Sequence, residues 1–224
     1  MAPRAVDIGG TVRERAAREL RDRILTGALP AGARLDLDAI TEEFATSRTP
    51  VREALLELSY EGLVRVAPRS GITVIGISPG DIMDSFTILG VLTGQAAAWA
   101  AERATDEELR HLRDLADEVA SRSGENAIAE ANWHLHQEIH RASHSPRLLT
   151  QIGQSARVVP TDFLRLFPER EQHSLDDHDR LINALAARDP ARARDIAEQH
   201  VLAAGRSLTE WLRRSSGQTE SPER

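Results

Sequence analysis

The sequence contains no cysteine and no lysine, and the first absence excludes several kinds of chemistry. Without cysteine the 224-residue chain can form no disulfide, no thiolate metal site and no cysteine nucleophile. Histidine, aspartate, glutamate and asparagine are then the side chains left to bind a transition metal. The absence of lysine, with all 28 basic residues arginine, is no evidence of function. The eight histidines are therefore the residues that need an explanation.

Long apolar runs are also missing from the chain. No stretch approaches the roughly 20 apolar residues that a membrane-spanning helix needs. Residues 1–10 lack the apolar core of a secretory signal. We therefore expect a soluble, cytoplasmic protein with no membrane partner. The length favours two domains of modest size.

The negative charge is unevenly distributed along the chain. A formal net charge of −7 argues against indiscriminate attraction to nucleic acid. Residues 1–76 carry 11 arginines and 11 acidic side chains, so the whole excess lies in residues 77–224. Any contact with DNA is thus expected in the N-terminal third.

Apolar periodicity divides this N-terminal third into helices and a hairpin. Helical spacing and stop signals predict helices at residues 12–26, 37–44 and 47–62, with a turn at 28–34. Ser47 or Thr49 can cap the third helix, and Pro50 falls in its first turn, where the missing N–H is harmless. Two β-rich runs around the Pro/Gly turn at 67–71 then predict a hairpin.

The remainder of the chain is expected to be helical. The periodic segments lie at about 80–102, 105–122, 126–143, 146–166, 171–187 and 190–214. We thus expect a mainly α protein with a winged helix-turn-helix domain at 11–76, a linker at 77–80 and an all-α domain at 81–214. The arm at 1–10 and the tail at 215–224 are expected to be disordered.

The third predicted helix has the residues that DNA recognition needs. Its apolar stripe is formed by Val51, Ala54, Leu55 and Leu58. Arg48 and Arg52, four residues apart, project together beside that stripe. Arginine matches the O6 and N7 atoms of guanine, and the hydroxyls of Ser47 and Thr49 can bond phosphates. The wing contact would come from Arg69, with Gly71 allowing the backbone to approach. In the alternative, the two arginines form weak surface ion pairs with Glu53 or Glu57.

A longer string favours DNA recognition. Residues 47–64, SRTPVREALLELSYEGLV, strongly resemble the recognition helix of the GntR family of bacterial regulators, and VAPRSGITV at 66–74 resembles its wing. The resemblance covers the whole first domain. It implies that operator DNA is contacted by Ser47, Arg48, Thr49, Arg52, Arg69 and Gly71. The second helix departs from the family's frequent basic or other polar residue, because it carries Asp36, Asp38, Glu42 and Glu43.

The helical remainder resembles the ligand-binding (FCD-type) domain of the FadR/VanR branch, which implies an antiparallel bundle of six or seven helices. Metal-binding members of this branch have a carboxylate four residues before a histidine, and two further histidines on the final helices. The matching positions are Asn132, His136, His178 and His200. Such a set suits a divalent metal, with Zn²⁺ first and Ni²⁺ or another borderline cation as alternatives, and leaves positions open for an effector carboxylate.

The other histidines are less informative. His140 lies four residues after His136, so a place in the metal shell stays open. The remaining histidines, His111, His134, His144 and His173, are expected to be ordinary core or surface residues. Members of this branch often carry an Arg and a Glu on the first helix of the domain, where Leu89 and Thr93 align here. A less polar effector pocket is expected.

These observations predict a transcriptional regulator. We expect a repressor that leaves a palindromic operator when a small molecule, such as an organic acid, binds at the metal. One recognition helix covers too few base pairs for a unique site, so a homodimer is expected. Two alternatives stay open: a metal-dependent hydrolase with an attached DNA-binding domain, whose base would be Glu138 or Asp177, and a helical domain that serves only as a dimerisation scaffold.

Overall fold

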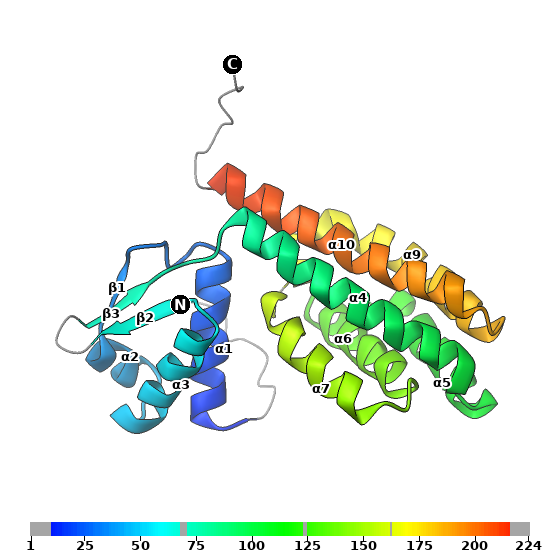
Figure 1. Ribbon diagram of the computed structural model, residues 1–224, viewed down its shortest axis with the longest axis horizontal. Coiled ribbons are helices and arrows are strands. Elements are labelled where there is room, and N and C mark those ends of the chain that lie inside the picture. The colour runs from blue at the N-terminus through cyan, green and yellow to red at the C-terminus, as the bar shows by residue number, and fades with distance from the viewer. Residues whose placement is uncertain (1–9, 68–70, 123–124, 162, 216–224) are drawn as a thin grey trace, which may run out of the picture. The chain divides into compact units, whose positions relative to one another are not determined.

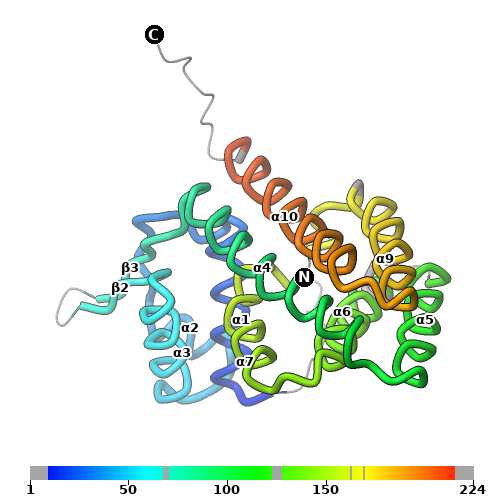
Figure 2. Tube along the Cα trace, turned by 45° about the vertical axis from the view of Figure 1, so that its right-hand side comes forward, coloured from blue at the N-terminus to red at the C-terminus, as the bar shows by residue number. Residues whose placement is uncertain are grey.

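The computed structural model describes residues 10–67, 71–122, 125–161 and 163–215 (Figures 1 and 2). It divides the chain into two compact units, one formed by Met1–Pro79 with Trp211–Arg224 and the other by Gly80–Glu210. Apart from Gly10 and Ser215, the arm and tail predicted to be disordered lie outside the described residues. Within the described ranges no helix is long and apolar enough to cross a bilayer.

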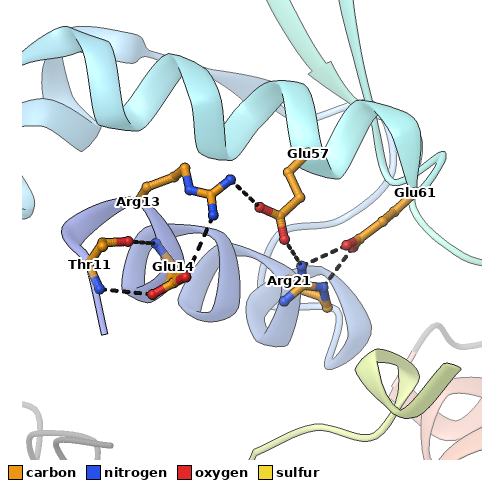
Figure 3. A network of polar contacts seen from close by, with 6 residues as sticks. All are labelled: Thr11, Arg13, Glu14, Arg21, Glu57 and Glu61. Carbon is orange, nitrogen blue, oxygen red and sulfur yellow. Dashed lines mark hydrogen bonds and ion pairs between the residues drawn. The ribbon is translucent and has the colours of Figure 1, made fainter. Parts of the chain in front are cut away.

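The first unit begins with the three predicted helices, each within two residues of its expected bounds. They are α1 (Val12–Leu25), α2 (Leu37–Glu43) and α3 (Arg48–Tyr60). Helix α1 starts at a capping box: the Thr11 hydroxyl accepts from the Glu14 N–H, and the Glu14 carboxylate accepts from the Thr11 N–H (Figure 3). The Asp36 side chain caps α2 with a single bond, by accepting from the Asp38 N–H at 2.8 Å.

The sheet has one more strand than the sequence predicts. Strands β2 (Val64–Ala67) and β3 (Gly71–Val74) form the expected antiparallel hairpin, and β1 (Arg34–Leu35) pairs with the other edge of β3 in the order β1-β3-β2. Arg34 lies opposite Thr73, and Leu35 opposite Ile72. The prediction of a plain turn through residue 34 was therefore wrong at its end, because a two-residue strand is too short to show alternation.

The apolar face of α3 is fixed to α1 by both packing and charge. Val51, Ala54, Leu55 and Leu58 are each at most 1% exposed. Arg21 of α1, itself buried, donates to the Glu61 carboxylate through Nε at 2.7 Å and Nη2 at 2.8 Å, and lies 3.4 Å from Glu57 (Figure 3). Glu57 is also paired with Arg13. Its carboxylate therefore holds α3 on α1 instead of neutralising the arginines at the start of α3.

The second unit is built from helices. After α4 (Pro79–Arg103) come α5 (Asp106–Ser121), α6 (Glu125–Arg141), α7 (Pro146–Ser155), α8 (Phe163–Leu166), α9 (Glu171–Ala186) and α10 (Pro190–Ser215). The prediction of one helix over 146–166 was wrong, because α7 ends at Ser155 and a short 3₁₀ turn follows. Pro160 prevents the helix from resuming after this turn, since it has no N–H to donate and the preceding Val159 is extended (φ −84°, ψ 116°).

Helices α4 and α10 lie side by side in both views (Figures 1 and 2). Glycine permits this close approach, because a Cβ atom at Gly205 would lie 2.7 Å from the Phe86 side chain. The same core joins the helices that carry the candidate metal ligands: Leu135 of α6, Leu181 of α9 and Ile196 of α10 belong to one buried cluster. The side chains next to these residues are thus held on a close-packed frame.

Candidate functional site

Three histidines from three helices meet inside the second unit. His136 on α6, His178 on α9 and His200 on α10 each offer a nitrogen, and these nitrogens lie within 4.8 Å of one another. The Nε2 atoms of His136 and His178 are 3.3 Å apart. Two nitrogens bound to one tetrahedral Zn²⁺ at about 2.05 Å would be separated by roughly 3.3 Å. The spacing of this pair already fits a shared metal ion.

Burial keeps the imidazoles of His136 and His178 neutral. His178 is 3% exposed, and its burial lowers its pKa to about 3. The pKa of His136 lies well below its usual range, first through burial and then through the neighbouring histidines. Only the neutral ring has a lone pair to give to a metal, so low pKa values remove the competition from protons near pH 7.

Asp177 orients the third histidine. Its Oδ2 lies 3.3 Å from Nδ1 of His200, and this bond is the main cause of the lowered pKa of the Asp177 carboxyl. Because an ionised carboxylate only accepts, Nδ1 is the donor in this bond, and Nε2 is the ring nitrogen left to bind a metal. In metal sites, a histidine that binds the metal commonly donates its other ring N–H to a carboxylate in this way. The sequence alone suggests Asp177 only as a hydrolase base; its position beside His178 was the signal for this second role.

Asn132 lies on the same face of α6 as His136, one turn earlier. Its side-chain Oδ1 is buried, and no hydrogen-bond partner is found for it among the described residues. A bare buried oxygen is costly unless something binds it. The orphaned oxygen therefore fits a metal ligand at the position that the family resemblance indicated.

His140 stays outside the group of three. Its ring centroid is 6.3 Å from that of His136, and burial lowers its pKa to about 4. His134 and His144 pair with Glu138 and Glu108 at the surface. His111 and His173 are exposed, whereas the aligned pair Leu89 and Thr93 is buried.

Two further polar groups lie near His178: Ser174 on α9, and Arg170, the N-cap of that helix. Ser174 and His178, four residues apart, share one face of α9, and Arg170 precedes Ser174 by a further four residues. The Ser174 hydroxyl is 3.4 Å from Nε2 of His178. The Nε of Arg170 is buried, with no hydrogen-bond partner in the described part of the chain, and its charge contributes to the low pKa of Asp177. Neither group is predicted from the sequence, although the spacing is visible there.

The candidate DNA contacts of the first unit lie at the N-terminal end of α3. Ser47, Arg48, Thr49 and Arg52 are all exposed. Ser47 is the N-cap, yet its hydroxyl makes no capping bond. Arg48 is paired with Asp38, whereas Arg52 forms no ion pair with any described residue. In the wing, Gly71 has φ +85° and open space around it, and Arg69 lies outside the described residues.

Comparison with known proteins identifies both units. Residues 12–74 match the model of the bacterial regulatory proteins of the gntR family, and residues 84–203 match the model of the FCD domain. The chain belongs to the GntR family. This GntR protein is therefore a DNA-binding transcriptional regulator with an FCD domain, and not an enzyme.

Full-length relatives support the assignment. This GntR regulator is 28% identical over 208 residues to a probable D-xylose utilization operon transcriptional repressor from Paenarthrobacter nicotinovorans, covering 85% of this chain and 88% of that one. It is 29% identical over 194 residues to the regulator McbR of Escherichia coli K12, covering 82% and 88%. The solved structure of E. coli McbR/YncC superposes with a TM-score of 0.67 at 25% identity, covering 90% of this chain and 98% of that one.

Both candidate bases of the hydrolase alternative are already engaged in ion pairs. Glu138 is engaged by His134 and Arg141. The Asp177 carboxylate binds the outer nitrogen of His200 and also pairs with Arg180 at 3.1 Å. Nothing in the geometry or in the family assignment supports hydrolysis.

Proposed function

We propose that this GntR regulator is a homodimeric repressor that leaves a palindromic operator when a small anionic effector binds at a metal centre in its FCD domain. The convergence of three imidazoles from α6, α9 and α10 carries the proposal. The repressor role is supported by the name of the D-xylose operon relative.

The metal would be held by His136, His178 and His200, with Asn132 as an oxygen ligand. When bound, a divalent cation such as Zn²⁺, or Ni²⁺ as the alternative, supplies an electrophilic centre for an effector oxygen. Asp177 fixes the ring of His200.

The buried Arg170 Nε and the Ser174 hydroxyl suit a second oxygen of the same effector. These groups favour an organic acid over a neutral molecule.

Effector binding can be coupled to DNA binding because the metal ligands come from three helices. An effector that binds one arrangement of α6, α9 and α10 more tightly than another shifts the population toward it. In a dimer, that shift would change operator affinity through residues 77–80, which join the two units in the sequence.

For DNA, the exposed Arg48 and Arg52 suit base edges in the major groove, and the free hydroxyl of Ser47 suits a phosphate. Thr49 adds a second hydroxyl at this helix end. Two copies related by a two-fold axis would bind an inverted repeat.

The test begins with selection of DNA sites from a random library by the purified full-length protein, together with sedimentation of the complex. We expect inverted repeats and a dimer. The protein is then stripped with a chelator, reloaded with Zn²⁺ or Ni²⁺, and tested for release of the selected DNA by a panel of carboxylic acids and matched amides. Release should require both metal and carboxylate. Asymmetric sites, monomers at micromolar concentration, or release that is indifferent to the metal would contradict the proposal.

A further inference from the structure

One of the two arginines on the DNA-facing side of α3 is already bound to a carboxylate. Arg48, the first residue of α3, donates through Nε to Oδ1 of Asp38 at 2.7 Å and through Nη2 to Oδ2 at 2.8 Å. Asp38 is the second residue of α2. Arg52, one turn further along α3, forms no ion pair with the described residues. In the absence of DNA, Arg48 is therefore ion-paired and Arg52 is not, as far as the described residues show.

The pair has no evident role in folding. The side chains of Arg48 and Asp38 are 66% and 64% exposed. Exposed ion pairs contribute little to stability, because water competes for both charges. The geometry is nevertheless well defined, with two parallel hydrogen bonds of the kind that fixes a guanidinium plane.

We propose that Asp38 is a specificity-determining residue that directs Arg48 toward a base edge and away from phosphates. This inference rests on the proposed role of α3 in operator binding. Asp38 would act through Arg48 and so is a positioning residue.

The donors that remain on Arg48 support this assignment. Asp38 uses the Nε edge of the guanidinium. The Nη1 group and one N–H of Nη2 are not used by Asp38, so the end of the fork stays available. Two parallel N–H groups at that end match the O6 and N7 acceptors of guanine. Arg48 can thus keep its carboxylate partner while it contacts a base.

Charge distinguishes a base from a phosphate at this position. A phosphate on Arg48 would bring a second anion close to the Asp38 carboxylate, and the two negative charges would repel each other. The edge of guanine presents neutral acceptors, so it meets no such repulsion. Asp38 therefore lowers the affinity of Arg48 for the backbone of any sequence and leaves the contact with the correct base intact.

The carboxylate is held on a rigid support. The Asp36 side chain accepts from the Asp38 N–H and caps α2. A negative charge in the first turn of a helix is favoured by the helix dipole. Ile40, on the next turn of α2, is 6% exposed and belongs to the same core as Val51 and Leu55 of α3. The packing thus fixes the two helices that carry the pair.

Asp38→Asn and Glu42→Gln form a matched test. Each removes one negative charge from α2, but Glu42 is exposed and makes no side-chain bond to the described residues. Affinities of the full-length variants are measured for the selected operator, for operators with each single base replaced, and for random DNA at several salt concentrations. Arg48→Ala identifies the base position that Arg48 contacts, and melting temperatures confirm folding.

Glu42→Gln should raise the affinity for operator and random DNA by the same factor and keep all base preferences. Asp38→Asn should raise the affinity for random DNA by a larger factor, and should lose about tenfold of the discrimination at the Arg48 position alone. Equal behaviour of the two variants, while Arg48→Ala still loses that base preference, would overturn the role of Asp38 only. No change of base preference in Arg48→Ala would overturn the proposed role of Arg48 in DNA binding as well.

Discussion

The two units of this regulator prepare their candidate sites in opposite ways. The start of α3 presents charged, exposed side chains, whereas the three histidines of α6, α9 and α10 are buried or partly buried inside the second unit. DNA brings its own high charge and meets arginines that are always protonated, so nothing needs to be buried in advance. A metal needs free lone pairs, which burial secures by lowering the histidine pKa. We therefore expect function and stability to be separable in the first unit and coupled in the second.

The largest expected effect comes from removing one metal ligand. His178→Ala should abolish retention of Zn²⁺ and remove the metal-dependent part of the stability, because ligands from only two helices remain. At a free metal concentration of about 100 times Kd, bound metal stabilises the folded state by roughly 2.7 kcal/mol. Elemental analysis and melting with and without chelator measure both effects.

His144→Ala is the control for this variant. His144 is exposed and pairs with Glu108, away from the three histidines. It should keep wild-type metal content and the wild-type response to chelator. A wild-type protein that cannot be loaded with any divalent metal would contradict the site altogether.

The next largest effect that we expect is a loss of stability at low pH in the second unit and not in the first. All eight histidines lie between residues 111 and 200. The folded pKa values of His140 and His178 are about 4 and 3, whereas an unfolded histidine titrates near 6.5. The unfolded chain therefore binds more protons below pH 6.5, and stability is lost as the pH falls from there toward the folded values. Each such histidine should cost the metal-free second unit roughly 1.4 kcal/mol between pH 7.5 and 5.5.

Hydrogen exchange of the chelator-treated protein at pH 7.5 and 5.5, resolved by segment, measures this loss. Helices α5, α6 and α9 should lose protection, whereas α1 and α3 should not lose it through this mechanism. His140→Gln, which leaves the three proposed histidine ligands in place, should reduce the pH dependence. Equal losses in both units would show that buried histidines are not the cause.

Arg52→Ala tests the exposed site. It should weaken operator binding by about 1–3 kcal/mol and relax the preference at one base pair in each half-site. Because Arg52 is exposed and forms no ion pair with the described residues, the melting temperature should hardly change. Binding assays with wild-type and singly substituted operators measure the first effect. A variant that melts lower but keeps its base preference would reverse the expected separation.

The sequence predicted most of the fold because the apolar stripes are long. The burial of Val51, Ala54, Leu55 and Leu58 follows from their spacing alone. The predictions that were wrong concern features whose sequence signal covers only one or two residues. Strand β1 is a two-residue pairing set by the position of β3 in space, and the end of α7 at Ser155 depends on the conformation of the next few residues.

The candidate metal site was accessible from the sequence only through family resemblance. His136 and His178 are 42 residues apart, so their spacing cannot show that their nitrogens meet. The sequence contains still less information about which acidic side chains pair with the site residues. That Asp177 faces His200, and that Asp38 faces Arg48, depends on the crossing of helices and on side-chain direction.

The smallest effect that we expect is a gain in metal affinity. In Asn132→Asp the oxygen that lacks a partner becomes a carboxylate, which attracts a divalent cation more strongly than an amide does. Metal affinity should rise by about tenfold, roughly 1.4 kcal/mol. The metal-free variant should be less stable than wild type, because a buried carboxylate without a cation pays for its desolvation. Asn132→Ala should bind the metal less tightly than wild type, without the loss of stability that a buried carboxylate causes. Competition with a calibrated chelator and melting of metal-free protein measure the two quantities. If all three proteins bind metal equally, Asn132 is not a ligand and the histidines act without it.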